Sequence, residues 1–130
     1  MYNTNRQCIR RNNLKSMLYV AKKIGTTEDE YGNQKVEYDE PIKYYFNIMP
    51  ANTSSDIQAF GERAASMKVA VITEKDKFLN EFNEFDVAYL DGITPEDEPE
   101  NGYNANYRIY AVQPQNAIIK VYFLKLVKNN

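Results

Sequence analysis

The fold class is decided by the last quarter of the chain, which reads Asn-Tyr-Arg-Ile-Tyr-Ala-Val (106–112), Gln-Pro-Gln-Asn (113–116) and Ala-Ile-Ile-Lys-Val-Tyr-Phe-Leu-Lys-Leu-Val-Lys (117–128). Both outer segments are rich in β-branched and aromatic residues, which favour strands. Pro114 and Asn116 lie between them and are typical of turns, since Pro fixes φ and Asn tolerates a left-handed backbone. The pattern predicts a β-hairpin.

The second arm of this hairpin is apolar on both faces. Alternation of side chains along a strand places Ile119 and Val121 on one face and Ile118 and Tyr122 on the other. A strand of this kind needs cover on both sides, so we expect it at the centre of a closed or layered sheet.

Length and composition limit the protein class. The chain has 130 residues, 43% of them hydrophobic, with 5 Gly and 5 Pro, as expected of one folded domain. Cys8 is the only cysteine, so neither an internal disulfide nor a cysteine-rich metal site can form. No apolar run has the ~20 residues of a membrane helix, and we expect no membrane partner.

Charge is unevenly distributed along the chain. The net charge is -2, but residues 1–27 and 101–130 contain basic residues and no acid, while all 18 acids lie in residues 28–100. If both termini lay on one side, the molecule would have a positive and a negative pole through which copies could contact one another. Folding could equally intermix these charges, because blocks in a sequence do not define spatial faces.

The remaining elements are short. We predict a basic N-terminal arm over residues 1–13 and a single β-barrel domain over residues 14–130, in which Gly and Pro separate the strands. The expected elements are strands at 14–23, 35–38, 42–49, 67–73 and 85–90, a reversal at 26–34 containing Gly32 and Asn33, a break at Pro41, and a helix capped by residues 52–56 and stopped by Gly61. The sum is a mainly β fold, a small antiparallel barrel of about six strands with one short helix and long loops.

We expect no enzyme and no cofactor. The chain has no histidine, so Ser-His and Cys-His nucleophiles cannot be assembled. The acidic loop at 93–105, with Asp91 before it, could pair carboxylates for a cation or a sugar, but clustered acids between prolines are more typical of a solvated surface loop. The acids concerned are Asp91, Glu96, Asp97, Glu98 and Glu100.

Nucleic acid is a further class of partner. Several of the 11 tyrosines lie beside basic residues, for example Tyr107 and Tyr110 beside Arg108, and such a face could stack bases. Tyrosine is also a good strand former that packs half-buried. The acidic overall balance argues against sequence-specific binding and leaves non-specific proximity to DNA.

The succession of segments 55–61, 67–72, 84–92, 105–112 and 118–125 resembles the head-completion, or head-to-tail joining, proteins of long-tailed bacteriophages. The resemblance covers about Leu14 to Lys125 and contains no catalytic signature. It implies a small β-barrel in a homo-oligomeric ring, typically dodecameric, located in the head-tail connector of the virion and made in the bacterial host cytoplasm. Such a ring contacts an adaptor or other portal-proximal connector protein above and a tail protein below, and some members act as stoppers that retain packaged DNA.

Within this hypothesis three segments are candidate sites. The arm residues Arg6, Arg10 and Arg11 would contact a neighbour or partner, and the acidic loop would lie at a subunit contact. The candidate channel-loop residues are Ser54, Ser55, Asp56, Gln58, Glu62 and Arg63. A tail-terminator or tail-tube ring protein stays an alternative, and so does a monomeric binding domain or carboxylate enzyme.

Overall fold

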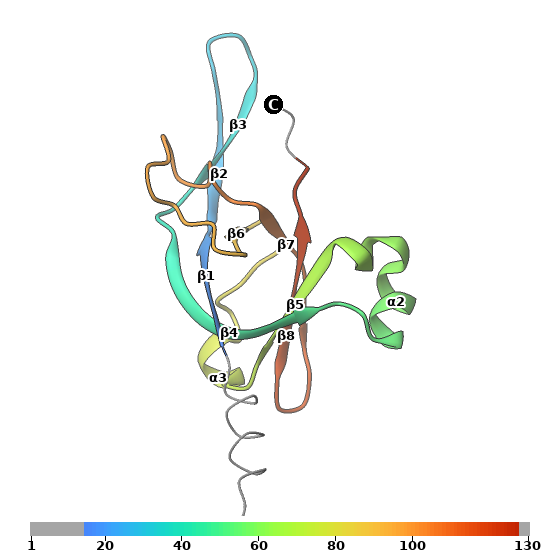
Figure 1. Ribbon diagram of the computed structural model, residues 1–130. Coiled ribbons are helices and arrows are strands. Elements are labelled where there is room, and N and C mark those ends of the chain that lie inside the picture. Colours follow the sequence, from blue (N-terminus) through green and yellow to red (C-terminus); the bar gives the residue numbers. More distant parts are fainter. Residues whose placement is uncertain (1–14, 128–130) are drawn as a thin grey trace, which may run out of the picture.

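The computed structural model describes residues 15–127, in which six antiparallel strands close into a barrel in the order β1-β4-β5-β8-β7-β6 (Figure 1). The expectation of a small antiparallel barrel is therefore confirmed. The barrel strands are β1 (Ser16–Ala21), β4 (Ile42–Pro50), β5 (Met67–Ile72), β6 (Val87–Tyr89), β7 (Tyr107–Pro114) and β8 (Ile119–Lys125).

The predicted C-terminal hairpin is formed by β7 and β8, and β8 is covered on both faces. Ile119, Val121 and Phe123 point into the main core, each no more than 1% exposed. Tyr122 points outward and is 3% exposed, because it lies in a second cluster with Phe60 and the neighbouring strand β5. The two-sided apolar pattern thus places β8 at the centre of the fold, as expected.

The outer cover of β5 and β8 comes from the connection between β4 and β5. It contains α2 (Ser54–Phe60) and a short 3-10 helix, η1 (Gly61–Ser66). Thr53 caps α2, since its Oγ1 accepts a hydrogen bond from the Asp56 backbone N–H and the Asp56 carboxylate accepts one from the Thr53 N–H. The capping residues therefore start the helix as predicted, and Gly61 at φ 60° ends it.

A second short helix, α3 (Lys75–Phe78), covers one end of the barrel. The sequence pattern did not predict it, because its single turn lies in a highly charged stretch of the chain. Phe78 and Phe82 pack against Tyr44 and Phe46 on β4 with ring centroids 5.1 to 6.1 Å apart, so this segment does fold back on the barrel. Leu79, which follows Phe78 directly, is exposed.

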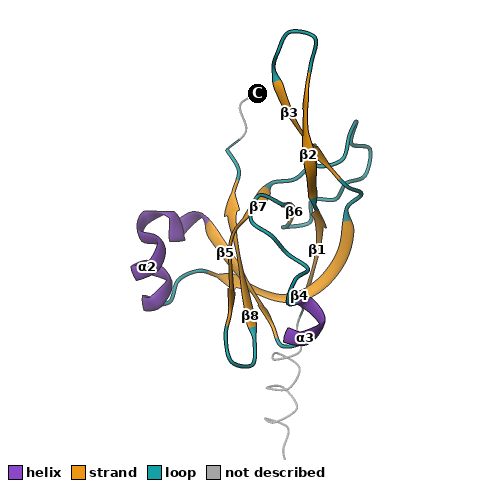
Figure 2. Cartoon of the chain, turned by 180° about the vertical axis from the view of Figure 1, so that it is seen from behind, coloured by secondary structure: helices purple, strands orange, loops and turns teal. Residues whose placement is uncertain are grey.

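The strands β2 (Lys23–Glu28) and β3 (Gln34–Tyr38) form a separate two-stranded sheet. In Figures 1 and 2 this hairpin stands away from the barrel, while α2 projects from a different side. The predicted strand at 14–23 is thus two strands, because the chain turns from the barrel into the hairpin at Lys22. The Asp39 N–H donates to the Lys22 carbonyl and the Lys23 N–H donates to Asp86 Oδ1, which fixes this corner.

Some predicted boundaries were wrong. β6 begins at Val87 rather than at residue 85, since Phe85 has a φ of 78° and is exposed. In the β2–β3 turn Gly32 has a positive φ but Asn33 does not. In the β7–β8 turn Asn116 also lacks the left-handed backbone that its residue type tolerates. No helix among the described residues is long and apolar enough to cross a membrane.

Candidate functional site

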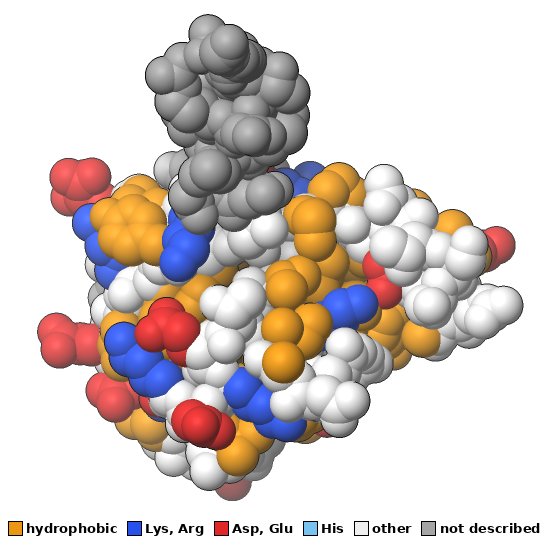
Figure 3. Space-filling view, turned by 90° about the horizontal axis from the view of Figure 1, so that it is seen from below, with side chains coloured by type: hydrophobic (Ala, Val, Ile, Leu, Met, Phe, Trp, Pro, Cys, Tyr) orange, Lys and Arg blue, Asp and Glu red, His pale blue; other side chains and the backbone are white. Residues whose placement is uncertain are grey.

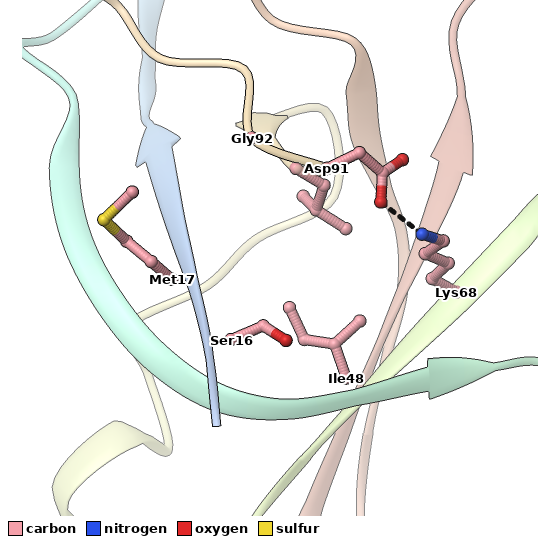
Figure 4. Close-up of a pocket in the computed structure, with 7 residues that line it drawn as sticks. Ser16, Met17, Ile48, Lys68, Asp91 and Gly92 are labelled. Atoms are coloured by element: carbon pink, nitrogen blue, oxygen red, sulfur yellow. Dashed lines mark hydrogen bonds and ion pairs between the residues drawn. The ribbon is translucent and has the colours of Figure 1, made fainter. Parts of the chain in front are cut away.

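One end of the barrel is open. A depression of about 370 Å³ is lined by the start of β1, by Ile48 on β4, by Lys68 on β5 and by Leu90 to Gly92 after β6. Figure 4 shows Lys68 and Asp91 pointing toward each other across its rim, where they form an ion pair. Tyr107 donates a hydrogen bond of 3.1 Å to the other carboxylate oxygen of Asp91. Partial burial opposes ionisation, yet the hydrogen bonds from Lys68 and Tyr107 hold the pKa of Asp91 below its ordinary value.

Of the five acids of the acidic loop, only Asp91 reaches this depression. Glu98 instead accepts hydrogen bonds from the hydroxyl of Tyr89, at 2.8 and 3.0 Å, and from the Asn104 backbone N–H. Tyr89 is fully buried, and burial together with the bond to Glu98 raises the pKa of its hydroxyl. The carboxylate of Glu98 therefore joins the acidic loop to the buried Tyr89 and to the loop's own backbone at Asn104.

The acidic loop is joined to strand β3 of the β2–β3 hairpin. Glu100 pairs with Lys35 at 2.6 Å, and the Asn101 side chain donates to the Tyr38 carbonyl at 3.3 Å. Gly102 lies so close to the Tyr38 ring that an added Cβ would be 2.6 Å from the ring carbon Cδ2. The loop and the hairpin form one connected projection.

These contacts separate the acids rather than gather them. Glu96 and Asp97 lie at the exposed side of the loop, where Asp97 takes a left-handed backbone with φ 62°. Across residues 15–127 no group of three or more His, Cys, Asp or Glu side chains is placed to hold a metal ion. Glu98 and Glu100 therefore hold the loop in place through contacts within their own chain.

The candidate channel segment lies on the outside of the barrel. Asp56 is buried and accepts a 2.7 Å hydrogen bond from the Tyr122 hydroxyl, which fastens α2 to β8. The other five predicted residues of this segment are exposed: Ser54, Ser55, Gln58, Glu62 and Arg63. The sequence did not separate the one buried anchor from its exposed neighbours, although Asp at the third position after a Thr cap is a signal of the capping role.

Arg63 and Arg108 converge on Tyr110. The Arg63 guanidinium donates to the Tyr110 hydroxyl at 3.1 Å and lies 5.7 Å from the ring centroid, while the Arg108 guanidinium lies 5.1 Å from it. The Phe60 ring packs edge-on against Tyr110 at 5.8 Å. We call Phe60, Arg63, Arg108 and Tyr110 the basic-aromatic patch. Sequence reasoning placed Arg108 beside Tyr110 and assigned Arg63 to the candidate channel loop, but it connected neither Arg63 nor Phe60 to Tyr110, since no local signal does so.

Tyr107, the other candidate for a stacking face, points into the core and is 4% exposed. Tyr110 points outward with Arg108 because side chains alternate along β7, and the register shift between Ile109 and Ala111 then keeps Ala111 on the outer face as well. Such a bulge inserts one extra residue and re-aims the side chains around it. Tyr107 and Tyr110 therefore lie on opposite faces of β7, and a base-stacking face at this strand could use Tyr110 but not Tyr107.

The tip of the β2–β3 hairpin is acidic. Asp29 Oδ1 accepts hydrogen bonds from the backbone N–H groups of Tyr31 and Asn33, at 2.9 and 2.8 Å, and so builds the turn. The hydrogen bond from Asn33 is the main cause that lowers the pKa of Asp29. Glu30 and Tyr31 extend beyond this turn, and Tyr31 is 81% exposed.

Blocks of charge along the chain are partly intermixed in space. Lys22 of the basic N-terminal block pairs with Glu81 at 3.5 Å. Figure 3 shows a face on which Lys and Arg side chains lie among hydrophobic and acidic ones. The arm residues Arg6, Arg10 and Arg11 lie outside the described residues.

Comparison with known proteins gives no relative: no family model, no curated protein and no solved structure matches this chain significantly.

Proposed function

We propose that this protein is a structural component of a bacteriophage head-to-tail connector, which forms a ring that completes the head after DNA packaging and joins it to the tail. One support is the place of the resembling segments in the fold. Four of the five lie on β5, β6, β7 and β8, and the fifth is α2, which packs against β8. The resemblance thus follows a contiguous part of the barrel wall.

The observation that carries the proposal is the projecting β2–β3 hairpin. Its strands belong to no larger sheet, and all residues from Thr26 to Val36 are exposed. A two-stranded ribbon is marginally stable in water unless something packs against it. The acidic loop contacts β3 at Lys35 and Tyr38, while the exposed turn at residues 29–33 lies beyond these contacts, as expected of an element that meets a neighbouring subunit.

A ring component also needs a rigid body. The closed barrel leaves no unpaired edge in its own sheet, and the aromatic residues at α3 fill one of its ends. In this proposal the barrel is the constant body, and the hairpin, the acidic loop and the α2–η1 segment make contacts. The bond between Asp56 and Tyr122 favours a fixed wall over a refolding gate for that last segment.

The test is the mass of the purified protein in solution, measured by light scattering alone and after mixing with portal–adaptor complexes or with tail tubes. We expect a ring, typically dodecameric, that forms alone or on the portal–adaptor complex. Assembly only on tail tubes would replace the proposal with a tail-terminator function. A monomer that binds neither component would refute a connector function.

A further inference from the structure

The hairpin tip has two side chains without an intramolecular role. Glu28 accepts a hydrogen bond from Gln34 and Asp29 builds the turn, but Glu30 has no ion pair within residues 15–127. Tyr31 beside it is one of the most exposed aromatic side chains. No basic residue occurs from Ile24 to Gln34, so the outer part of the hairpin carries a net negative charge. We call Glu30 and Tyr31 the hairpin tip.

The basic-aromatic patch carries the opposite charge, from Arg63 and Arg108. Its two guanidinium carbons both lie within 6 Å of one ring centroid and hence within about 11 Å of each other. Neither arginine has an ion pair within the described part of the chain. Both guanidinium groups are therefore free to pair with a carboxylate that approaches Tyr110. The patch is therefore suited to a carboxylate with an aromatic neighbour.

The hairpin tip and the patch do not meet within one molecule. In Figures 1 and 2 the hairpin extends from one end of the molecule, whereas α2 and η1 lie on its flank. Strand β3 is fixed to the acidic loop by the Lys35–Glu100 ion pair and by the hydrogen bond that the Asn101 side chain donates to the Tyr38 carbonyl, so the tip cannot fold back to the patch without breaking them. The complementary charges are thus available to a second copy.

We propose that the hairpin tip of one copy binds the basic-aromatic patch of the next, with the Glu30 carboxylate between Arg63 and Arg108 and the Tyr31 ring against Phe60 and Tyr110. Guanidinium–carboxylate pairs are directional and aromatic rings pack well at such centres, so the contact supplies both orientation and area. Because two different surfaces meet, the contact is head-to-tail and closes into a ring or extends into a filament. This inference rests on the proposed ring, whose subunit contact it names.

The experiment exchanges the charges. Glu30→Arg alone and Arg63→Glu alone are expected to weaken self-association about tenfold or more, since each places like charges together. The double variant Glu30→Arg/Arg63→Glu restores a pair of opposite charges and is expected to recover much of the association. Glu84→Arg makes the same charge change at an exposed position outside both surfaces and is expected to associate like the unaltered protein. Sedimentation measures the association, and circular dichroism checks that each variant is folded.

Failure of the contact is distinguishable from failure of the connector proposal. If the unaltered protein forms rings on portal–adaptor complexes and Glu30→Arg does so equally well, the contact is wrong while the connector function stands. If Glu30→Arg abolishes self-association but the unaltered protein joins no virion component, the contact stands without that function. Loss of binding to a double-stranded DNA fragment by Arg63→Glu, with unchanged self-association, would overturn the contact and assign the patch to the phosphate backbone.

Discussion

The hydroxyl of Tyr122 on β8 donates a 2.7 Å hydrogen bond to Oδ1 of Asp56 on α2, and both side chains are buried. Asp56 also accepts a hydrogen bond from the Thr53 N–H at 3.3 Å. One carboxylate thus caps the helix and fastens it to the barrel wall. Because a buried charge without hydrogen bonds is costly, this pair decides whether the outer layer stays attached.

Replacing Tyr122 with Phe should lower the free energy of unfolding by about 1–3 kcal/mol, because it leaves a buried carboxylate oxygen without its partner. Urea denaturation measures the loss. Tyr45→Phe is the matched control, since Tyr45 is exposed and its substitution removes the same hydroxyl without a buried partner. Equal effects of the two substitutions would contradict an anchoring role for Tyr122.

The stability of the protein should depend on pH through Asp91. Hydrogen bonds from Lys68 and Tyr107 outweigh burial and lower its pKa from the ordinary value of 3.8, so the unfolded chain binds the proton more readily than the folded one. The stabilisation is therefore complete above that value and is lost as the pH falls through the lower pKa of the folded state. Asp91→Asn should flatten this part of the profile of unfolding free energy against pH. A variant with the same acid dependence as the unaltered protein would exclude Asp91 as a contributor.

The contact between the acidic loop and the hairpin should be destabilised by the substitution Gly102→Ala. Gly102 has a φ of 90°, and its added Cβ would meet the Tyr38 ring at 2.6 Å, so backbone strain and a clash add to each other. We expect a loss of about 1–3 kcal/mol in unfolding free energy and faster amide exchange in β3. Gly25→Ala is the control, because no atom lies within 4 Å of its added Cβ. Unchanged exchange in β3 would show that the loop does not support it.

The barrel could be predicted from sequence because its strands have strong local patterns. The apolar residues on both faces of β8 predict a strand covered on both sides, and the capping sequence before α2 predicts the start of a helix. The reversal at 26–34 and the strand at 35–38 were predicted, but their separation from the barrel could not be. Residues 14–23 read as one continuous strand, and the turn at Lys22 is fixed by Asp86, far away in sequence. The basic-aromatic patch could not be predicted either, because Phe60 and Arg63 lie far from Tyr110 in sequence and meet it only in the folded barrel.

The closed end of the barrel yields the last prediction. Phe82 is 5% exposed and lies 5.1 Å from the Tyr44 ring centroid and 5.8 Å from that of Phe46, so Phe82→Ala removes the centre of an aromatic cluster. We expect the unfolding free energy to fall by about 3–5 kcal/mol, through lost burial and the cavity that remains. Phe85→Ala, three residues away, removes a ring that is 59% exposed and should change stability far less. Because this end lies away from the hairpin tip, a folded Phe82→Ala protein should self-associate like the unaltered one at low temperature. Weakened association in that folded variant would mean that the aromatic end of the barrel also contributes to the subunit contact.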